Sequence, residues 1–191
     1  ALENIKDNNF EISLDFILPN TDGIFPHSFR QDTHIKNSIL YDIGPYIFDF
    51  LWVLKFLKFK IHDLQVDYFK NMLIKKLKFK VSSNEQKLNK INVNIGYDNY
   101  YNNKLEFYSK KQCFTISPFF WGRKGIIEVI VSKCNGEKKI KISTESSLKI
   151  LLYKWFFEYN DGEINELQSF ERYKFIISKL EILENEVLGY V

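Results

Sequence analysis

Apolar and polar side chains alternate through the middle of the chain, and this pattern predicts strands. Leu77, Phe79 and Val81 alternate with lysines, and residues 91–97 alternate in the same way. Successive side chains of a strand point to opposite faces, so a period of two is typical of a sheet with one buried face. A further strand is predicted over Gln112–Ser117. The chain therefore changes to β-structure from about residue 77.

The strongest local signal is the dipeptide Asn135-Gly136, which stands between two β-rich arms. These arms are IIEVIVSK (126–133) and KKIKIS (138–143). Asn-Gly favours a tight primed turn, because both central residues of that turn take positive φ. The sequence therefore predicts a β-hairpin around this dipeptide.

Helical patterns flank this β-rich region. Residues 45–58 predict a buried helix, because Pro45 suits a first turn and Asp42 lies just upstream. The alternation in KFLKFKI (55–61) leaves a strand as the alternative there. Asp63–Lys76 predicts a second helix with apolar side chains on one face.

Two more helical stretches are predicted near the C-terminus. Apolar residues between Leu148 and Tyr159 recur at helical spacing, and the dipeptide Asp161-Gly162 follows them. A second stretch begins near Glu163. The tail, residues 175–191, is ambiguous between helix and strand.

The first 44 residues are polar and are interrupted by turn-forming pairs such as Pro19-Asn20 and Asp22-Gly23. Residues 12–18, ISLDFIL, predict either a short strand or an arm held on a partner. We therefore expect an extended, irregular N-terminal segment over 1–44 and a single α+β domain over 45–191. The expected fold class is an antiparallel β-rich core packed by amphipathic helices.

Composition indicates a globular chain, with 45% hydrophobic residues and a net charge of +3. Lysine outnumbers arginine twenty-four to three, a bias typical of an AT-rich genome. Because arginine is the usual bidentate ligand for phosphate and guanine, nucleic acid is a disfavoured partner. The eight lysines of residues 55–80, mixed with aromatics, keep nucleic-acid binding as an alternative function.

Aromatic residues make up 17% of the chain and gather in Tyr46–Phe59, where six of fourteen residues are aromatic. Such a segment must be buried, because a large apolar side chain gains roughly 1.5–3 kcal/mol on leaving water. Two interpretations are a core rich in Phe and Tyr, or aromatics that cover a subunit interface. The residues predicted for a partner interface are Phe48, Phe50, Trp52, Phe56, Phe119, Phe120 and Trp121.

No catalytic or metal-binding motif accompanies these patterns. His27, Asp32 and His34 lie close together, but their spacing matches no recognised ligand set. No nucleophile motif or phosphate-binding loop is present, so the sequence predicts no catalytic residue, no metal and no cofactor. Cys113 and Cys134 either form a cross-strand disulfide or remain two free thiols.

The longest apolar runs are too short to span a bilayer, and no signal peptide is visible. We therefore expect no transmembrane segment and a cytoplasmic location, with a secreted or periplasmic location left open. The oligomeric state is also left open.

The segment Tyr46–Leu57, YIFDFLWVLKFL, is similar to the opening helix of the wedge subunit of type VI secretion baseplates. LKFKVSS (77–83) resembles the short strand of that family, and INVNIGY (91–97) resembles its apolar segment that ends in a glycine turn. The resemblance implies a non-catalytic scaffold subunit of a virulence-associated secretion machine, with neighbouring subunits as partners.

The function expected from the sequence is thus a non-enzymatic structural subunit of a larger protein complex. The alternatives are a nucleic-acid-binding module and a secreted β-rich binding protein with a disulfide.

Overall fold

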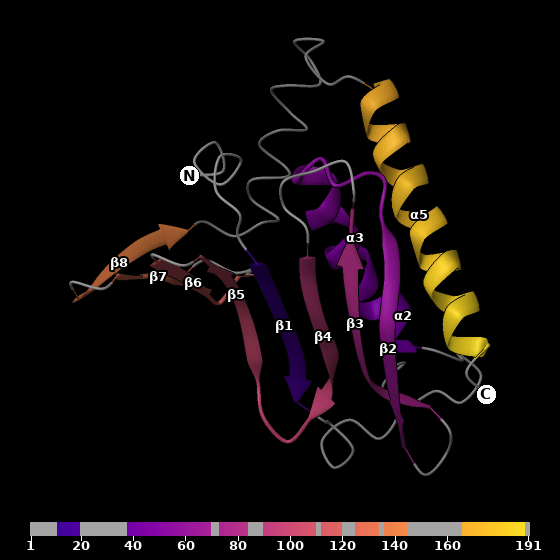
Figure 1. Ribbon diagram of the computed structural model, residues 1–191, viewed down its shortest axis with the longest axis horizontal. Helices are drawn as coiled ribbons and strands as arrows, with labels where there is room; N and C mark the ends of the chain where they lie inside the picture. The colour runs from indigo at the N-terminus through magenta and orange to yellow at the C-terminus, as the bar shows by residue number, and fades with distance from the viewer. Residues whose placement is uncertain are drawn as a thin grey trace.

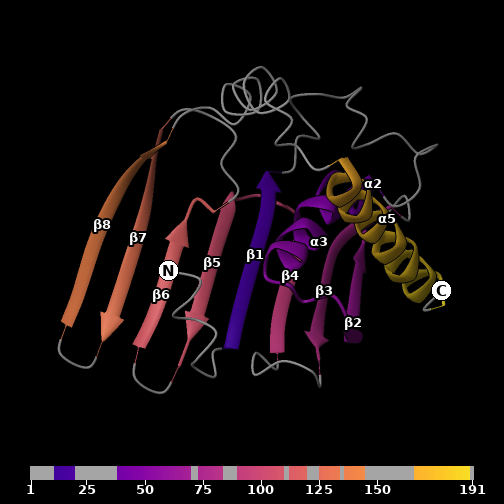
Figure 2. The same ribbon diagram turned by 90° about the horizontal axis from the view of Figure 1, so that it is seen from above.

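The computed structural model describes residues 11–19, 38–69, 73–83, 90–109, 112–119, 125–133, 136–144 and 166–189. Within them, eight strands form one sheet in the order β2-β3-β4-β1-β5-β6-β7-β8, shown in Figures 1 and 2. The strands are β1 (Glu11–Pro19), β2 (Lys60–Tyr68), β3 (Ile74–Ser82), β4 (Lys90–Asp98), β5 (Asn102–Tyr108), β6 (Gln112–Ser117), β7 (Gly125–Lys133) and β8 (Gly136–Thr144). The helices are α2 (Ser38–Asp42), α3 (Gly44–Val53) and α5 (Glu166–Leu188).

The sheet is mixed, which corrects the expectation of an antiparallel core. Strand β1 pairs with β4 in parallel and with β5 antiparallel. The β-rich α+β class is confirmed. A short hairpin forces the two strands that it joins to be antiparallel. Strand β1 is separated from β4 along the chain by α2, α3, β2 and β3, and this long connection allows the two strands to pair in parallel.

Strand β1 lies in the middle of the sheet. Its Ile12, Leu14 and Ile17 side chains are fully buried. Of the two alternatives for residues 12–18, the structure shows the strand. The domain boundary at residue 44 stays a prediction, although β1 hydrogen-bonds on both sides to strands from beyond that boundary.

The hydrophobic core lies between the sheet and the three helices. The alternating residues of β1, β3 and β4 supply one side, and α3 and α5 supply the other. The core includes Ile12, Leu14, Leu77, Phe79, Val81, Ile91, Val93, Ile95, Ile47, Phe48, Leu51, Leu180, Leu183 and Val187. Figure 2 shows the helices gathered at the β4-β3-β2 end, while β6, β7 and β8 carry none of the described helices.

The strands predicted around residues 77–81, 91–97 and 112–117 are confirmed as β3, β4 and β6. The hairpin is confirmed as well. Lys133 pairs with Gly136, and Gly136 has a φ of 132°, a value that favours glycine.

The helix predicted over Asp63–Lys76 is wrong, because this stretch contains β2 and the start of β3. A β-bulge between His62 and Gln65 places Asp63 at a φ of 55° and shifts the alternation by one residue. The shifted pattern imitates helical spacing. The helix predicted over 45–58 is shorter than expected, since α3 ends at Val53.

The tail forms α5, which resolves its ambiguity in favour of a helix. The helix predicted over 148–159 lies outside the described residues. Within the part of the chain that the structure describes, no helix is long and apolar enough to cross a membrane.

Candidate functional site

The start of α3 places a tyrosine beside the central strand of the sheet. Tyr46 is the third residue of this ten-residue helix, and Pro45 stands in its first turn. The Tyr46 ring meets the Phe16 ring edge-on, with centroids 6.0 Å apart, and 53% of the Tyr46 residue remains exposed. Its position is therefore fixed by packing, while the residue stays accessible.

Close packing of α3 on α5 sets this position. A Cβ atom built on Gly44 would lie 2.6 Å from Cδ2 of Leu180, so a side chain at residue 44 would displace the Leu180 side chain. Arg172 of α5 also binds both carboxylate oxygens of Asp49 in α3, at 2.5 and 2.6 Å. No local sequence pattern indicates either contact, since both join residues far apart along the chain.

A hydrogen bond ties the turn before α3 to the sheet. The Tyr97 hydroxyl of β4 donates to Oδ2 of Asp42 at 3.0 Å. Asp42 stands at the end of α2, only four residues before Tyr46. The aspartate predicted as a helix-start residue thus holds the turn against the sheet.

A buried amide lies opposite Phe16 in the sheet. Asn103 of β5 is 2% exposed, and its register partner in β1 is Phe16. Its Nδ2 donates to the Tyr101 hydroxyl at 2.9 Å, and its Oδ1 accepts the backbone N–H of Phe119 at 3.0 Å. Phe119 in turn meets the Phe50 ring of α3, with centroids 5.0 Å apart.

These contacts join three strands, β1, β4 and β5, to the start of α3. We call the group Asp42, Tyr46, Tyr97 and Asn103 the tyrosine site. Its half-buried Asp42 carboxylate can accept a hydrogen bond from a hydroxyl group, and its exposed Tyr46 hydroxyl can donate one to a carbonyl oxygen and move a proton. Asn103 is buried and already hydrogen-bonded within the protein. The sequence signal for it was the Asp42–Tyr46 run, which we interpreted only as the start of a helix.

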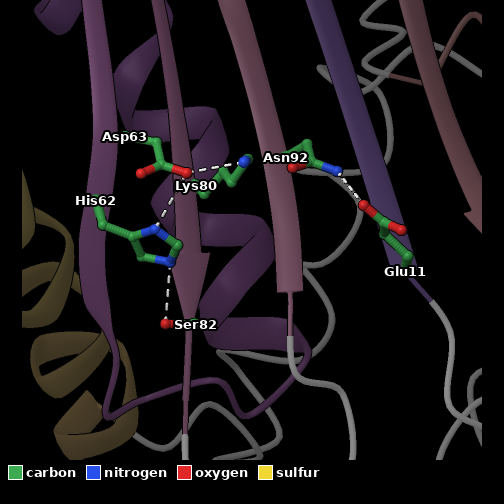
Figure 3. A network of polar contacts seen from close by, with 6 residues as sticks. All are labelled: Glu11, His62, Asp63, Lys80, Ser82 and Asn92. Carbon is green, nitrogen blue, oxygen red and sulfur yellow. Dashed lines mark hydrogen bonds and ion pairs between the residues drawn. The ribbon is translucent and has the colours of Figure 1, made fainter.

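The opposite face of the sheet carries a second polar cluster, drawn in Figure 3. His62 Nε2 lies 3.1 Å from Ser82 Oγ, and His62 Nδ1 lies 3.6 Å from Oδ2 of Asp63. Lys80 Nζ binds the same oxygen of Asp63 at 2.8 Å. The Lys80 hydrogen bond and charge lower the pKa of Asp63 and raise that of Lys80.

The order Ser82, His62, Asp63 resembles that of a hydrolytic triad, which no sequence motif indicated. The geometry argues against that chemistry. A separation of 3.6 Å is too long for the hydrogen bond that orients a catalytic histidine. Asp63 is also engaged by Lys80, and its side chain is 55% exposed. We interpret this cluster as a cross-strand ion network.

A third polar group surrounds Glu106 of β5 on the same face. Burial opposes ionisation of Glu106, but hydrogen bonds from Lys104, Tyr108 and Thr115 outweigh it and lower the pKa of the carboxyl group. Burial and the hydrogen bond to Glu106 raise the pKa of Tyr108. These lysine contacts show that part of the basic middle of the chain is already neutralised by acidic side chains.

The residues predicted for a partner interface differ in how far they are buried. Phe48, Phe50 and Phe56 lie in the core. Trp52 is half-buried and packs on Phe175, with ring centroids 5.3 Å apart. Phe120 and Trp121 lie outside the described residues. An interface at the accessible members of this set stays a prediction.

The other predicted site residues are only partly covered. The Cys113 Sγ lies 3.9 Å from Thr115 Oγ1. Cys134 lies outside the described residues, so pairing of the two cysteines stays a prediction. His27, Asp32 and His34 lie outside them too. Among the described residues, no group of three or more His, Cys, Asp or Glu side chains is placed to hold a metal.

Neither a protein-family model nor a curated protein matches the sequence. Solved structures do match its fold. A tyrosine-to-phenylalanine variant of KijD10, a 3-ketoreductase from Actinomadura kijaniata in complex with TDP-benzene and NADP, has a TM-score of 0.78. The identity is 10%, over 96% of this chain and 57% of the ketoreductase.

A second match is the dehydrogenase MviM from Clostridium difficile, with a TM-score of 0.59 and 14% identity. It covers 100% of this chain and 58% of the dehydrogenase. The chain thus spans a little over half the length of these oxidoreductases and shares the fold of that portion.

These findings correct the function expected from sequence. The resemblance to the wedge subunit of a type VI secretion baseplate is wrong, because the fold matches oxidoreductases. The expectation of a non-enzymatic structural subunit of a secretion machine is wrong for the same reason. The similarity rested on short aromatic and alternating segments. Such segments occur in many proteins in which a helix packs on a sheet, so they do not identify a family.

Proposed function

We propose that this chain is the substrate-side part of an oxidoreductase that interconverts a carbonyl and a hydroxyl group. The observation that carries the proposal is Tyr46, an accessible tyrosine held at the start of α3 on a sheet whose fold matches a ketoreductase. In this proposal Tyr46 is the acid that gives a proton to the carbonyl oxygen. It takes the proton back when the alcohol is oxidised.

Tyrosine suits that role because its hydroxyl can donate a proton to a developing alkoxide and accept it back. The edge contact with Phe16 limits the orientations of the ring.

The surroundings of Tyr46 suit a polar substrate. Asp42 brings a half-buried carboxylate to the turn just before Tyr46, and strands β5 and β6 carry none of the described helices. Carboxylates accept hydrogen bonds from the hydroxyls of sugars and other polyols. A hydroxylated ketone is therefore the substrate class that we propose.

Neither the sequence motifs nor the described part of the structure fits a dinucleotide cofactor. The sequence contains no G-x-G-x-x-G, since no two of its glycines are separated by a single residue. The sheet is mainly antiparallel and lacks the doubly wound parallel arrangement that presents a helix terminus to a pyrophosphate. We infer that a nicotinamide cofactor is held by a unit outside this chain, and we assign only the proton and the substrate contacts to the residues described.

The test uses the full-length protein that contains this chain. We expect it to oxidise NADPH or NADH in the presence of keto sugars or nucleotide-linked keto sugars, followed by nicotinamide absorbance. Tyr46→Phe should lower kcat by roughly 10²- to 10⁴-fold, because it removes the acid. The KM and the thermal midpoint should change little.

Tyr100→Phe is the matched control, because Tyr100 is about as exposed as Tyr46, at 49%, and lies outside the tyrosine site. It should retain the parent kcat. Full activity in Tyr46→Phe would overturn the role of Tyr46. Absence of carbonyl reduction across the ketone panel with both cofactors would overturn the proposed function itself.

A further inference from the structure

Strand β8 forms one end of the sheet, and no described strand lies beyond it. Figure 2 shows it at the end of the sheet away from α2, α3 and α5. Its residues 136–143 are all exposed. Every second residue of an edge strand directs its backbone N–H and C=O groups away from the sheet. These groups can hydrogen-bond to an extended segment of another molecule.

The opposite edge of the sheet, β2, is less suited to such pairing. Its register with β3 shifts between His62 and Gln65 and again between Asp67 and Tyr68, and Asp63 has a φ of 55°. Bulges bend a strand and interrupt its ladder, which protects an edge from further pairing. Strand β8 has no such interruption. All nine of its residues pair with β7 in continuous register, and none of them is a proline.

One face of β8 is apolar at its centre. The register pairs Ile140 with Val129 and Ile142 with Ile127, so these four side chains lie on the same face of the sheet. Ile140 is 39% exposed and Ile142 is 47% exposed. A strand added beside β8 would cover part of both side chains, and removal of this apolar surface from water would favour its binding.

The other face of β8 is basic. Lys139 and Lys141 alternate with the two isoleucines, so their side chains point to the opposite face of the strand. Both lysines are exposed, and Nζ of Lys139 lies 3.6 Å from Oε1 of Glu137 in the same strand. With Lys138, the strand carries three lysines and one glutamate. The edge therefore has a net positive charge that a neighbouring acidic strand would neutralise.

We propose that the outer edge of β8 binds an extended acidic segment of a partner protein, which adds one strand to the sheet. In this segment, apolar residues alternate with aspartate or glutamate. The apolar residues lie beside Ile140 and Ile142, and the carboxylates lie beside Lys139 and Lys141. Backbone hydrogen bonds provide affinity, and the alternation of side chains provides specificity.

The charges of β8 favour this acidic partner over a second copy of the chain. Two β8 strands paired edge to edge would bring the lysines of both copies together, and like charges on neighbouring strands are destabilising. A nucleic acid would be attracted to the lysines, but it could not continue the backbone ladder. An acidic strand pairs with the backbone groups, the isoleucines and the lysines at the same time.

The test measures binding of a labelled heptapeptide to the full chain by fluorescence anisotropy. Valine alternates with glutamate in this peptide, and both of its ends are capped. We expect saturable binding that weakens as salt rises, because the lysines are exposed to solvent. Amide hydrogen exchange should become slower in residues 136–144 when the peptide binds and should stay unchanged in β2.

Two further peptides separate the contributions of charge and backbone. A peptide with lysine in place of glutamate should bind at least about tenfold more weakly, because like charges would then lie side by side. A glutamate peptide with all its peptide nitrogens methylated keeps its charge but has no N–H donor for β8. It should also bind at least about tenfold more weakly. Both comparisons use the parent protein and do not depend on the folding of a variant.

Lys139→Glu combined with Lys141→Glu should raise the dissociation constant of the glutamate peptide about tenfold or more and should strengthen binding of the lysine peptide. Lys60→Glu combined with Lys78→Glu is the matched control. It makes the same change in net charge at exposed residues of β2 and β3, near the other end of the sheet. This control should leave the dissociation constant unchanged. Circular dichroism checks that each variant folds.

Three results would overturn the proposal. The first is the absence of saturable binding of the glutamate peptide to the parent chain. The second is equal binding of the methylated peptide, which would show attraction between charges without strand pairing. The third is slower exchange in residues 136–144 as the concentration of the chain alone rises, which would make a second copy the occupant of the edge. None of these results depends on oxidoreductase activity.

Discussion

The Tyr97 hydroxyl donates a hydrogen bond to Asp42 at 3.0 Å, and this bond holds the turn that begins α3 against the end of β4. Tyr97 is 4% exposed, so its ring is part of the core while its hydroxyl reaches the turn. The position of Tyr46 four residues after Asp42 depends on this contact.

Removal of that hydroxyl should destabilise the protein modestly. Tyr97→Phe should lower the free energy of unfolding by about 0.5–1.5 kcal/mol, because the half-buried Asp42 carboxylate loses a donor. Urea denaturation measures the change. Tyr100→Phe, on an exposed ring, should stay within about 0.5 kcal/mol of the parent. Equal stability of Tyr97→Phe and the parent would mean that water replaces the bond.

Tyr41 should make stability depend on pH only in the alkaline range. A hydrogen bond to Oε2 of Glu184, 2.6 Å long, raises the pKa of Tyr41 to about 12. A group whose pKa is raised by folding stabilises the fold below its unfolded pKa, near 10, and loses that effect as pH rises to 12. Tyr41→Phe should therefore be less stable than the parent at neutral pH, by less than about 1 kcal/mol since the residue is half exposed.

The difference between Tyr41→Phe and the parent should shrink between pH 10 and 12. Denaturation at several pH values measures it, and the loss of tyrosinate absorbance at high pH in the variant checks the assignment. A stability difference that stays constant through this range would show that the hydrogen bond does not control the titration of Tyr41.

Gly96 of β4 has no room for a side chain. A Cβ atom there would lie 2.9 Å from the carbonyl oxygen of Lys75 and 3.1 Å from Cα of Lys76. These are backbone atoms, so Gly96→Ala should destabilise the fold by about 1–3 kcal/mol.

Thermal unfolding tests this prediction. Gly189→Ala serves as its control, because the nearest atom there is 3.5 Å away and the contact is ordinary. A Gly96→Ala protein as stable as Gly189→Ala would show that β3 and β4 can separate without cost.

The Arg172–Asp49 pair should help to hold α5 on α3. Its two short bonds make a bidentate contact, and the hydrogen bond to Asp49 raises the pKa of Arg172. Both side chains are more than a third exposed, so Arg172→Ala should lower the free energy of unfolding by only about 0.5–1 kcal/mol.

Arg172→Lys should recover little of that stability, because a lysine cannot make the two-pronged contact. Chemical denaturation at low and high salt measures both variants. Lys174→Ala, which removes an exposed charge from the same helix, should be close to neutral. If Arg172→Ala and Lys174→Ala lowered the free energy of unfolding equally, the effect would come from the change in net charge and not from the Arg172–Asp49 contact.

Local patterns in the sequence predicted much of the sheet. The period of two at Leu77–Val81 and residues 91–97 survives in β3 and β4, because each strand buries one face. Asn135-Gly136 predicted its hairpin, because the turn geometry depends on two adjacent residues. The pattern failed at Asp63, where a bulge with positive φ interrupts the period of two. The apolar residues from Leu64 onward then have a spacing in the sequence that resembles that of a helix.

The tyrosine site was only partly visible in the sequence. The Asp42–Tyr46 run and Pro45 indicated the start of a helix, and α3 does begin at Gly44. No local pattern shows that Tyr97 and Asn103 lie beside that start. The Tyr97–Asp42 hydrogen bond joins residues 55 positions apart, and Asn103 pairs with Phe16 because β1 enters the sheet between β4 and β5.

The sequence by itself determined the β-rich α+β fold class, most of the strands, one hairpin and the burial of Phe48, Phe50 and Phe56 in the aromatic segment. Each of these follows from spacing within about ten residues, where side-chain periodicity and turn geometry act. The tertiary structure decided the direction of β1, the placement of Tyr46, and the contacts of Tyr97 and Asn103. These depend on which strands become neighbours, and that is decided by packing of the whole core against α3 and α5.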